Sequence, residues 1–133
     1  MQSHTDGTSI ITTVSAEAAA LYTKGVALLI TSSPDARNKL RAAVEADSHL
    51  AVAFAALAVD DQSHGLTSEG DQAIALSLAR MHGTTRRERQ HVEIVALILR
   101  GDVARARALR AAHLAEFPLD SLIVHLLEPF DPA

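Results

Sequence analysis

The stretch from Thr84 to Pro118, TTRRERQHVEIVALILRGDVARARALRAAHLAEFP, decides the fold because it carries the clearest helix boundaries in the chain. Thr85 and Glu88 have the spacing of a capping box, in which a threonine caps the first turn and a glutamate reaches back to it. Gly101 is typical of the residue that follows a helix, and Pro118 prevents a second helix from continuing. The stretch therefore predicts two helices joined by a tight turn.

Composition points to a single helical domain of 133 residues. Apolar residues make up 48% of the chain and aromatic residues only 3%, so the core must be built from alanine, leucine, valine and isoleucine. Small side chains allow helices to approach closely, whereas sheets usually rely on β-branched and aromatic residues. The chain has no cysteine, which excludes disulfides and thiolate metal sites.

Charge and targeting signals give a default location. The net charge is −4, which provides no general attraction to nucleic acid or to an anionic membrane. The first residues lack the basic start and apolar run of a signal peptide. No segment reaches the roughly eighteen apolar residues of a membrane span. We therefore expect a cytoplasmic protein, and the many arginines and alanines are typical of a bacterial gene.

Helical periodicity begins after a polar start. Residues 1–13 show no period and predict a mobile tail. From residue 14 onward, apolar side chains recur at steps of three and four residues, interrupted by clusters of polar residues, glycine and proline. A short closing helix is expected over 119–128. The prediction is an all-α domain over 14–133 with six to seven helices.

The breaks between these helices recur at a nearly constant spacing. The ends of the pairs fall at Ser48, Gly83 and Pro118, which are 35 and 35 residues apart. The turns within the pairs fall at Thr31, Gly65 and Gly101, which are 34 and 36 residues apart. This period predicts three antiparallel helix pairs, over about 14–48, 49–83 and 84–118, stacked like tetratricopeptide repeats. The alternative is an irregular helical bundle with coincidental spacing.

Two motifs add a family resemblance. The runs TRRERQHV from Thr85 and HLAEFPLD from His113, together with LRGD from Leu99, resemble the N-terminal part of the tetratricopeptide repeat protein 38 family. The resemblance covers roughly 47–125 and implies a truncated or stand-alone relative of longer proteins. It implies an array of helix pairs with a binding role, and it supplies no enzymatic activity that could be transferred to this chain.

The helix predicted after Thr85 has an apolar face and a polar stripe. The apolar face, which we expect to be deeply buried, runs over 92–99. The stripe and its neighbouring imidazole comprise Arg86, Arg89, Gln90, His91, Glu93 and Arg100. Because guanidinium groups bind carboxylates at two points, the stripe is the candidate surface for an acidic or peptide ligand. The alternative is a solvated face with a weak ion pair between Arg89 and Glu93.

Two short motifs place a carboxylate and an imidazole on one helical face. These are Glu88 with His91, and Asp61 with His64. Similar pairs build di-iron sites in helical bundles. Here Glu88 already caps a helix and Asp61 lies at a helix end, so we expect no metal, no cofactor and no catalytic residue. A small-molecule or metal-binding enzyme using Glu88 and His91 in a pocket between helices is the alternative.

Basic residues gather in one part of the chain. Eight of the twelve lysines and arginines lie between Arg80 and Arg110, which gives that segment a charge of about +5. These arginines spread around their helices, and no aromatic residue lies among them to stack on bases. We therefore do not expect nucleic acid as a partner.

The closing helix is too apolar to cap the end of a repeat array. It carries Leu122, Ile123, Leu126 and Leu127, which predicts an exposed patch that joins two copies of the chain. His113 and His125 are flanked by apolar residues and predict hydrogen-bonded core histidines. The sequence as a whole predicts a non-catalytic scaffold that binds a peptide or protein, or forms a homodimer.

Overall fold

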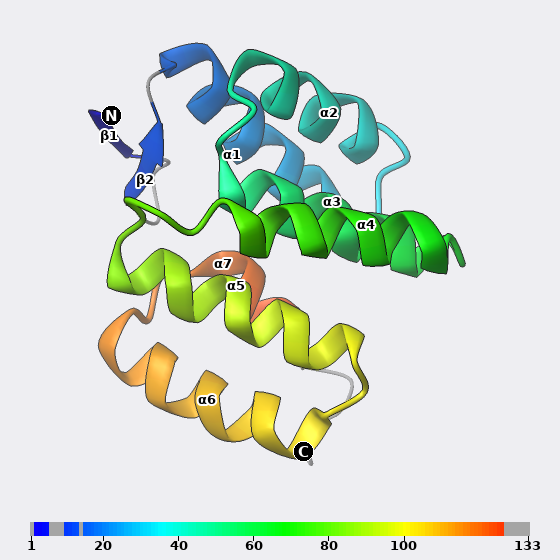
Figure 1. The fold of residues 1–133 in the computed structure, drawn as a ribbon, viewed down its shortest axis with the longest axis vertical. Helices are drawn as coiled ribbons and strands as arrows, with labels where there is room; N and C mark the ends of the chain where they lie inside the picture. The colour runs from blue at the N-terminus through cyan, green and yellow to red at the C-terminus, as the bar shows by residue number, and fades with distance from the viewer. Residues whose placement is uncertain (1, 6–9, 14, 127–133) are drawn as a thin grey trace.

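The computed structural model describes residues 2–5, 10–13 and 15–126, and seven helices lie within these ranges (Figure 1). The helices are α1 (Ala16–Ile30), α2 (Ala36–Ala46), α3 (Ala51–Ser63), α4 (Thr67–Ala79), α5 (Arg86–Leu99), α6 (Val103–Glu116) and α7 (Ser121–Leu126). The predicted all-α architecture of seven helices is confirmed. None of the described helices is both long and apolar enough to cross a membrane.

The first six helices form three packed pairs. Helices α1 and α2, α3 and α4, and α5 and α6 lie against each other, and α3 links the pairs by contacting both α2 and α5. Figure 1 shows the pairs following one another along the long axis of the molecule. Gly65 and Gly101 lie in the turns within the second and third pairs with φ of 75° and 81°, a conformation that favours glycine. The predicted pairing and both turn glycines are therefore confirmed.

Helix α3 is the centre of the core. Nine of its thirteen residues are buried, compared with eight of fourteen in α5, whose apolar face the sequence predicted to be deeply buried. The buried positions of α3 are mostly alanine, and alanine lets neighbouring helices approach from several sides. A helix that is apolar all round is expected at the centre of a domain.

Two short strands lie within residues 1–13, the range that the sequence predicted to be a mobile tail. Strand β1 (Gln2–Thr5) pairs antiparallel with β2 (Ile10–Thr13). Ile11 is fully buried in the main core, and the hydroxyl of buried Thr13 donates a hydrogen bond to Asp47 at the end of α2. An isolated hairpin is marginally stable at best, so these two contacts explain why it is ordered against the helices.

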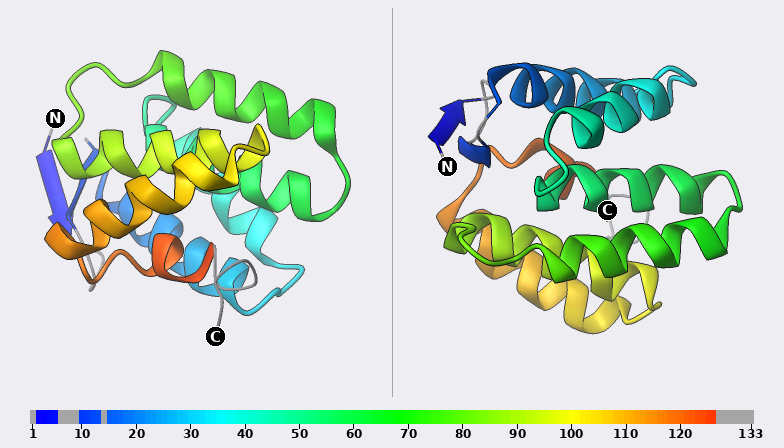
Figure 2. Two further views of the ribbon diagram at one scale, coloured as in Figure 1. Left: turned by 90° about the horizontal axis from the view of Figure 1, so that it is seen from below. Right: turned by 45° about the horizontal axis from the view of Figure 1, so that its top comes forward.

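Helix α7 folds back onto the array. It contacts α1, α5 and α6, and Figure 2 shows it lying beside α1 on the side away from α4. Leu122 and Ile123 are 1% and 0% exposed, and Leu126 packs against the same core. The prediction that this helix presents an exposed patch for a second copy is therefore wrong for these three residues. Leu127, the fourth predicted member, lies outside the described residues.

The close approach of α1 and α2 depends on Gly25, and Gly25→Ala is expected to destabilise the protein. An alanine Cβ there would lie 2.6 Å from Cδ2 of Leu40, which is fully buried and cannot move freely. Alanine gains about 1 kcal/mol of helix propensity over glycine, but overpacking a core costs about 1–3 kcal/mol. We expect urea unfolding to show a lower free energy of unfolding for Gly25→Ala. The exposed substitution Ala20→Ser on the same helix should change that free energy little. A stabilised Gly25→Ala variant would contradict this packing.

Candidate functional site

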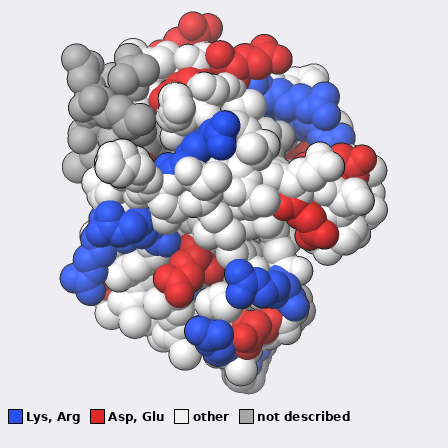
Figure 3. Space-filling model, in the orientation of Figure 1, with Lys and Arg blue, Asp and Glu red and all other residues white. Residues whose placement is uncertain are grey.

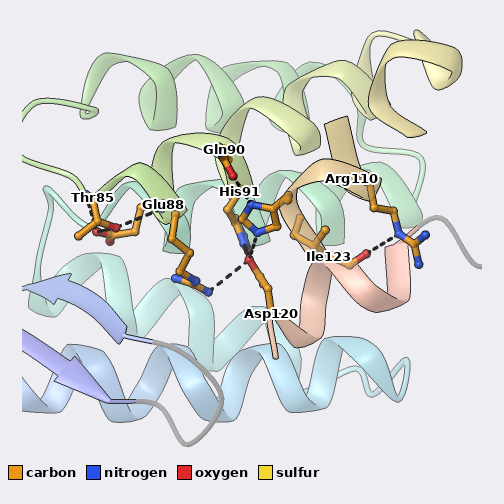
Figure 4. Close-up of polar contacts among 9 residues, drawn as sticks. Thr85, Glu88, Gln90, His91, Arg110, Asp120 and Ile123 are labelled. Carbon is orange, nitrogen blue, oxygen red and sulfur yellow. Dashed lines mark hydrogen bonds and ion pairs between the residues drawn. The ribbon is translucent and has the colours of Figure 1, made fainter. Parts of the chain in front are cut away.

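Helix α5 begins with the predicted capping box. The Glu88 amide donates to the Thr85 hydroxyl at 3.2 Å, and the Thr85 amide donates to the Glu88 carboxylate at 3.0 Å (Figure 4). The Glu88 residue is only 1% exposed. Its carboxylate therefore fixes the start of α5, as predicted, and does not face a pocket together with His91.

The predicted polar stripe of α5 divides into an outer and an inner group. Arg86, Arg89, Glu93 and Arg100 are the exposed members. A terminal nitrogen of Arg86 lies 3.2 Å from a carboxylate oxygen of Glu116 on α6. Arg89 donates a hydrogen bond to the main-chain oxygen of Thr84 at 2.6 Å rather than to Glu93. Exposed ion pairs of this kind are worth at most about 1 kcal/mol. The outer group is a solvated helix surface.

Charges of both signs share the surface near this stripe. On the face drawn in Figure 3, basic and acidic side chains alternate over the lower half, where α5 and α6 lie. A nucleic-acid footprint would instead need basic side chains gathered on one face. The cluster of arginines in the sequence does not become a continuous basic area on that face.

The inner members of the stripe join a buried polar cluster around Asp120, the residue that precedes α7 (Figure 4). Nδ1 of His91 lies 2.9 Å from the Asp120 carboxylate, and Nε2 of His113 lies 2.8 Å from it. Nδ1 of His113 lies 2.8 Å from the side-chain oxygen of Gln90, and a terminal nitrogen of Arg87 lies 3.4 Å from Asp120. We call these five residues the Asp120 cluster. It ties α5, α6 and the start of α7 together.

The cluster keeps Asp120 ionised. Burial on its own would raise the pKa of Asp120, but the charge of His91 lowers it. Hydrogen bonds from both histidines and the charge of Arg87 lower this pKa further, far below its ordinary value of 3.8. A buried carboxylate with so many partners is a strong structural anchor, because any one missing partner leaves a charge uncompensated.

The centre of the Asp120 cluster is closed to solvent. The side chains of His91 and His113 are 0% exposed and that of Asp120 is 2% exposed. Nε2 of His91 is buried without a hydrogen-bond partner among the described residues. The predicted role of His113 as a hydrogen-bonded core histidine is confirmed, and its partners are the side chains of Gln90 and Asp120.

Part of this cluster could have been found in the sequence. Arg87 and His91 are four residues apart and therefore share one face of α5, next to Gln90. Asp120 could not be found in this way, because nothing in the local sequence shows that a residue 29 positions after His91 lies beside it.

A separate cavity of about 260 Å³ lies where α1, α3 and α7 meet. Its apolar wall consists of Leu29, Ile30, Val59, Leu122 and Leu126. Its polar wall consists of Ser32, Ser33, Asp60, Ser63, His64 and His125. We call this the α1–α3–α7 pocket. None of the residues that the sequence proposed for ligand binding lines it.

Polar contacts at one side of this pocket link α2 and α3. Nε of Arg37 donates to the Asp60 carboxylate at 3.2 Å, and a terminal nitrogen of the same guanidinium donates to Asp61. Burial raises the pKa of Asp61, Arg37 opposes that rise, and Asp60 adds to it. Nδ1 of His64 lies 2.8 Å from the main-chain oxygen of Asp60.

These contacts change two sequence interpretations. The Asp61 carboxylate faces Arg37, and His64 bonds to Asp60, so Asp61 and His64 do not act as a pair. His125 is exposed at the pocket, which makes its prediction as a core histidine wrong. Among the residues that the structure describes, no three histidine, aspartate or glutamate side chains lie where they could hold a metal ion.

No family model, curated protein or solved structure matches this chain. The family resemblance indicated by the motifs of α5 and α6 therefore stays a prediction.

Proposed function

We propose that the chain is a non-catalytic interaction module that holds one side chain of a protein or peptide partner in the α1–α3–α7 pocket. The size of the pocket carries this proposal. At about 260 Å³ it is smaller than the roughly 300–1,000 Å³ of most cofactor and drug-sized ligand sites. An anchor side chain from a partner protein fits such a space, and buried anchors of this kind dominate many interfaces.

The alternative of an enzyme using Glu88 and His91 has less support. Glu88 is committed to the capping box, and His91 is fully buried in the Asp120 cluster. A general acid or base must come within hydrogen-bond reach of a substrate proton. Neither Glu88 nor His91 meets that requirement in the structure, so we favour a binding function over a catalytic one.

Repeat architecture supports the same proposal. Three helix pairs with breaks 34 to 36 residues apart agree with a tetratricopeptide-like array, and we propose that the chain is a degenerate array of this kind. Such arrays use extended surfaces to bind partners. In this chain α7 covers part of the array and forms one wall of the pocket, so the partner would contact α1, α3 and α7 together.

A peptide array with two matched variants tests the proposal. We expect the chain to bind a subset of random dodecapeptides, and Ser63→Phe to weaken that binding by about tenfold or more, because the added ring fills the pocket. Gln62→Phe is the control, since Gln62 is exposed on the same turn of α3 and does not line the pocket. Absence of peptide binding, or equal binding by both variants, would contradict the proposal.

A further inference from the structure

The α1–α3–α7 pocket lies at the carboxyl ends of two helices. Leu29 and Ile30 are the last residues of α1, and Ser63 and His64 end α3. The carbonyl groups at a helix C-terminus carry a partial negative charge of about half an electron. Neither helix has a basic residue in its last turn to offset it. The position of the pocket therefore favours a positively charged group.

The buried carboxylate in the pocket wall adds to this negative potential. The side chain of Asp60 is 3% exposed. Nε of Arg37 lies 3.2 Å from its Oδ2, and Nδ1 of His64 lies 3.7 Å from its Oδ1. The guanidinium of Arg37 also pairs with Asp61, so two carboxylates share one positive charge.

Other polar groups of the pocket also offer hydrogen-bond acceptors. The main-chain oxygen of Asp60 can only accept, so Nδ1 of His64 must donate to it, and Nε2 of a neutral His64 then carries a lone pair. The Ser63 hydroxyl donates to the same oxygen at 2.7 Å, which leaves its own lone pairs to accept. These two groups and the Asp60 carboxylate could accept N–H donors.

We infer that the pocket binds an alkylammonium group, supplied by a lysine side chain of the partner or by a free alkylamine. The apolar wall matches the carbon stem, and the acceptors match the three N–H donors of an ammonium. Lysine fits better than arginine because a guanidinium binds best to a carboxylate with both oxygens open, whereas Asp60 Oδ2 is already bound by Arg37. This inference rests on the proposed function and specifies the chemistry of the anchor.

Three small probes test the inference on the whole chain. These are N-acetyl-lysine methylamide, its uncharged analogue N-acetyl-norleucine methylamide, and pentylamine, each titrated at pH 8 while amide NMR signals are followed. We expect the lysine probe to bind at least about tenfold more tightly than the norleucine probe, the difference that charge-assisted hydrogen bonds provide. The shifts should centre on Leu29, Ser63 and His64. Tighter binding of the lysine probe than of pentylamine would indicate a lysine side chain of a partner. Tighter binding of pentylamine would indicate a free alkylamine.

Protein variants provide a second measurement. Asp60→Asn is expected to weaken binding of the lysine probe by about tenfold, and His64→Leu to weaken it less, since the side chain of His64 is half exposed to water. Asp71→Asn is the control, because it removes the same charge from an exposed site on α4. If Asp60→Asn does not fold, the comparison of the lysine and norleucine probes in the unchanged protein still tests whether the pocket prefers an ammonium group.

The outcomes separate this inference from the proposed function. Equal binding of the lysine and norleucine probes would overturn the inference and leave the interaction module intact. The same holds if neither probe binds while dodecapeptides still bind and Ser63→Phe still blocks them. Loss of all probe and peptide binding would overturn both.

Discussion

Asp120→Ala is expected to lower the free energy of unfolding by about 3–5 kcal/mol, the cost of removing one partner from a buried ionic cluster. The substitution leaves His91, His113 and Arg87 facing one another without their shared carboxylate, at positions that water does not reach. It also frees the start of α7, which Asp120 ties to α5 and α6. Urea unfolding followed by circular dichroism measures the loss.

A matched control separates this cluster from ordinary surface charge. Glu116 carries the same charge at the end of α6 and pairs with Arg86, but its side chain is 39% exposed. Glu116→Ala should therefore cost at most about 1 kcal/mol. Similar losses for the two variants would show that the Asp120 cluster contributes no more than a surface pair.

Acid should reduce the stability that ionised Asp120 contributes. The pKa of Asp120 is lowered in the folded chain, so the folded state releases this proton more readily than the unfolded state does. Its contribution is fully present above the ordinary value of 3.8 and is lost as pH falls through that value toward the folded pKa. The difference in unfolding free energy between the unchanged protein and Asp120→Ala should therefore shrink below about pH 4. If this difference in unfolding free energy instead grew as the pH fell, the lowered pKa of Asp120 in the folded chain would be contradicted.

Local signals made the helix pairs predictable. The capping box at Thr85, the left-handed glycine at Gly101 and the stop at Pro118 each act within one or two turns of chain, so their residues can be read directly from sequence. The same is true of the period between breaks, which depends only on spacing. These features fixed the order and bounds of α5 and α6 closely.

Long-range packing could not be predicted in the same way. An apolar segment such as α7 shows that it must bury one face, but not whether a second copy or its own array covers that face. The partners of Asp120 come from α5 and α6, and the pocket joins residues of α1, α3 and α7. Both sites exist only because α7 folds back onto the array. Because the sequence analysis expected α7 to face a second copy, it could predict neither site.

Ile123→Ala tests that position of α7 directly and is expected to cost about 2–5 kcal/mol, because it opens a cavity at a fully buried site in the main core. The neighbouring Val124 is 36% exposed, and Val124→Ala should change the unfolding free energy by only about 0.5 kcal/mol. Urea unfolding of the two variants under identical conditions gives the comparison.

The same variant distinguishes a core helix from a dimer interface. If α7 joined two copies, Ile123→Ala would lower the mass measured by light scattering and leave the unfolding of each copy nearly unchanged. A core position predicts the opposite, with unchanged mass and a large loss of stability. Since Leu122 lines the α1–α3–α7 pocket beside Ile123, loosening α7 should also weaken binding of the lysine probe. Loss of stability and loss of binding in one variant would show that α7 is part of both the core and the site.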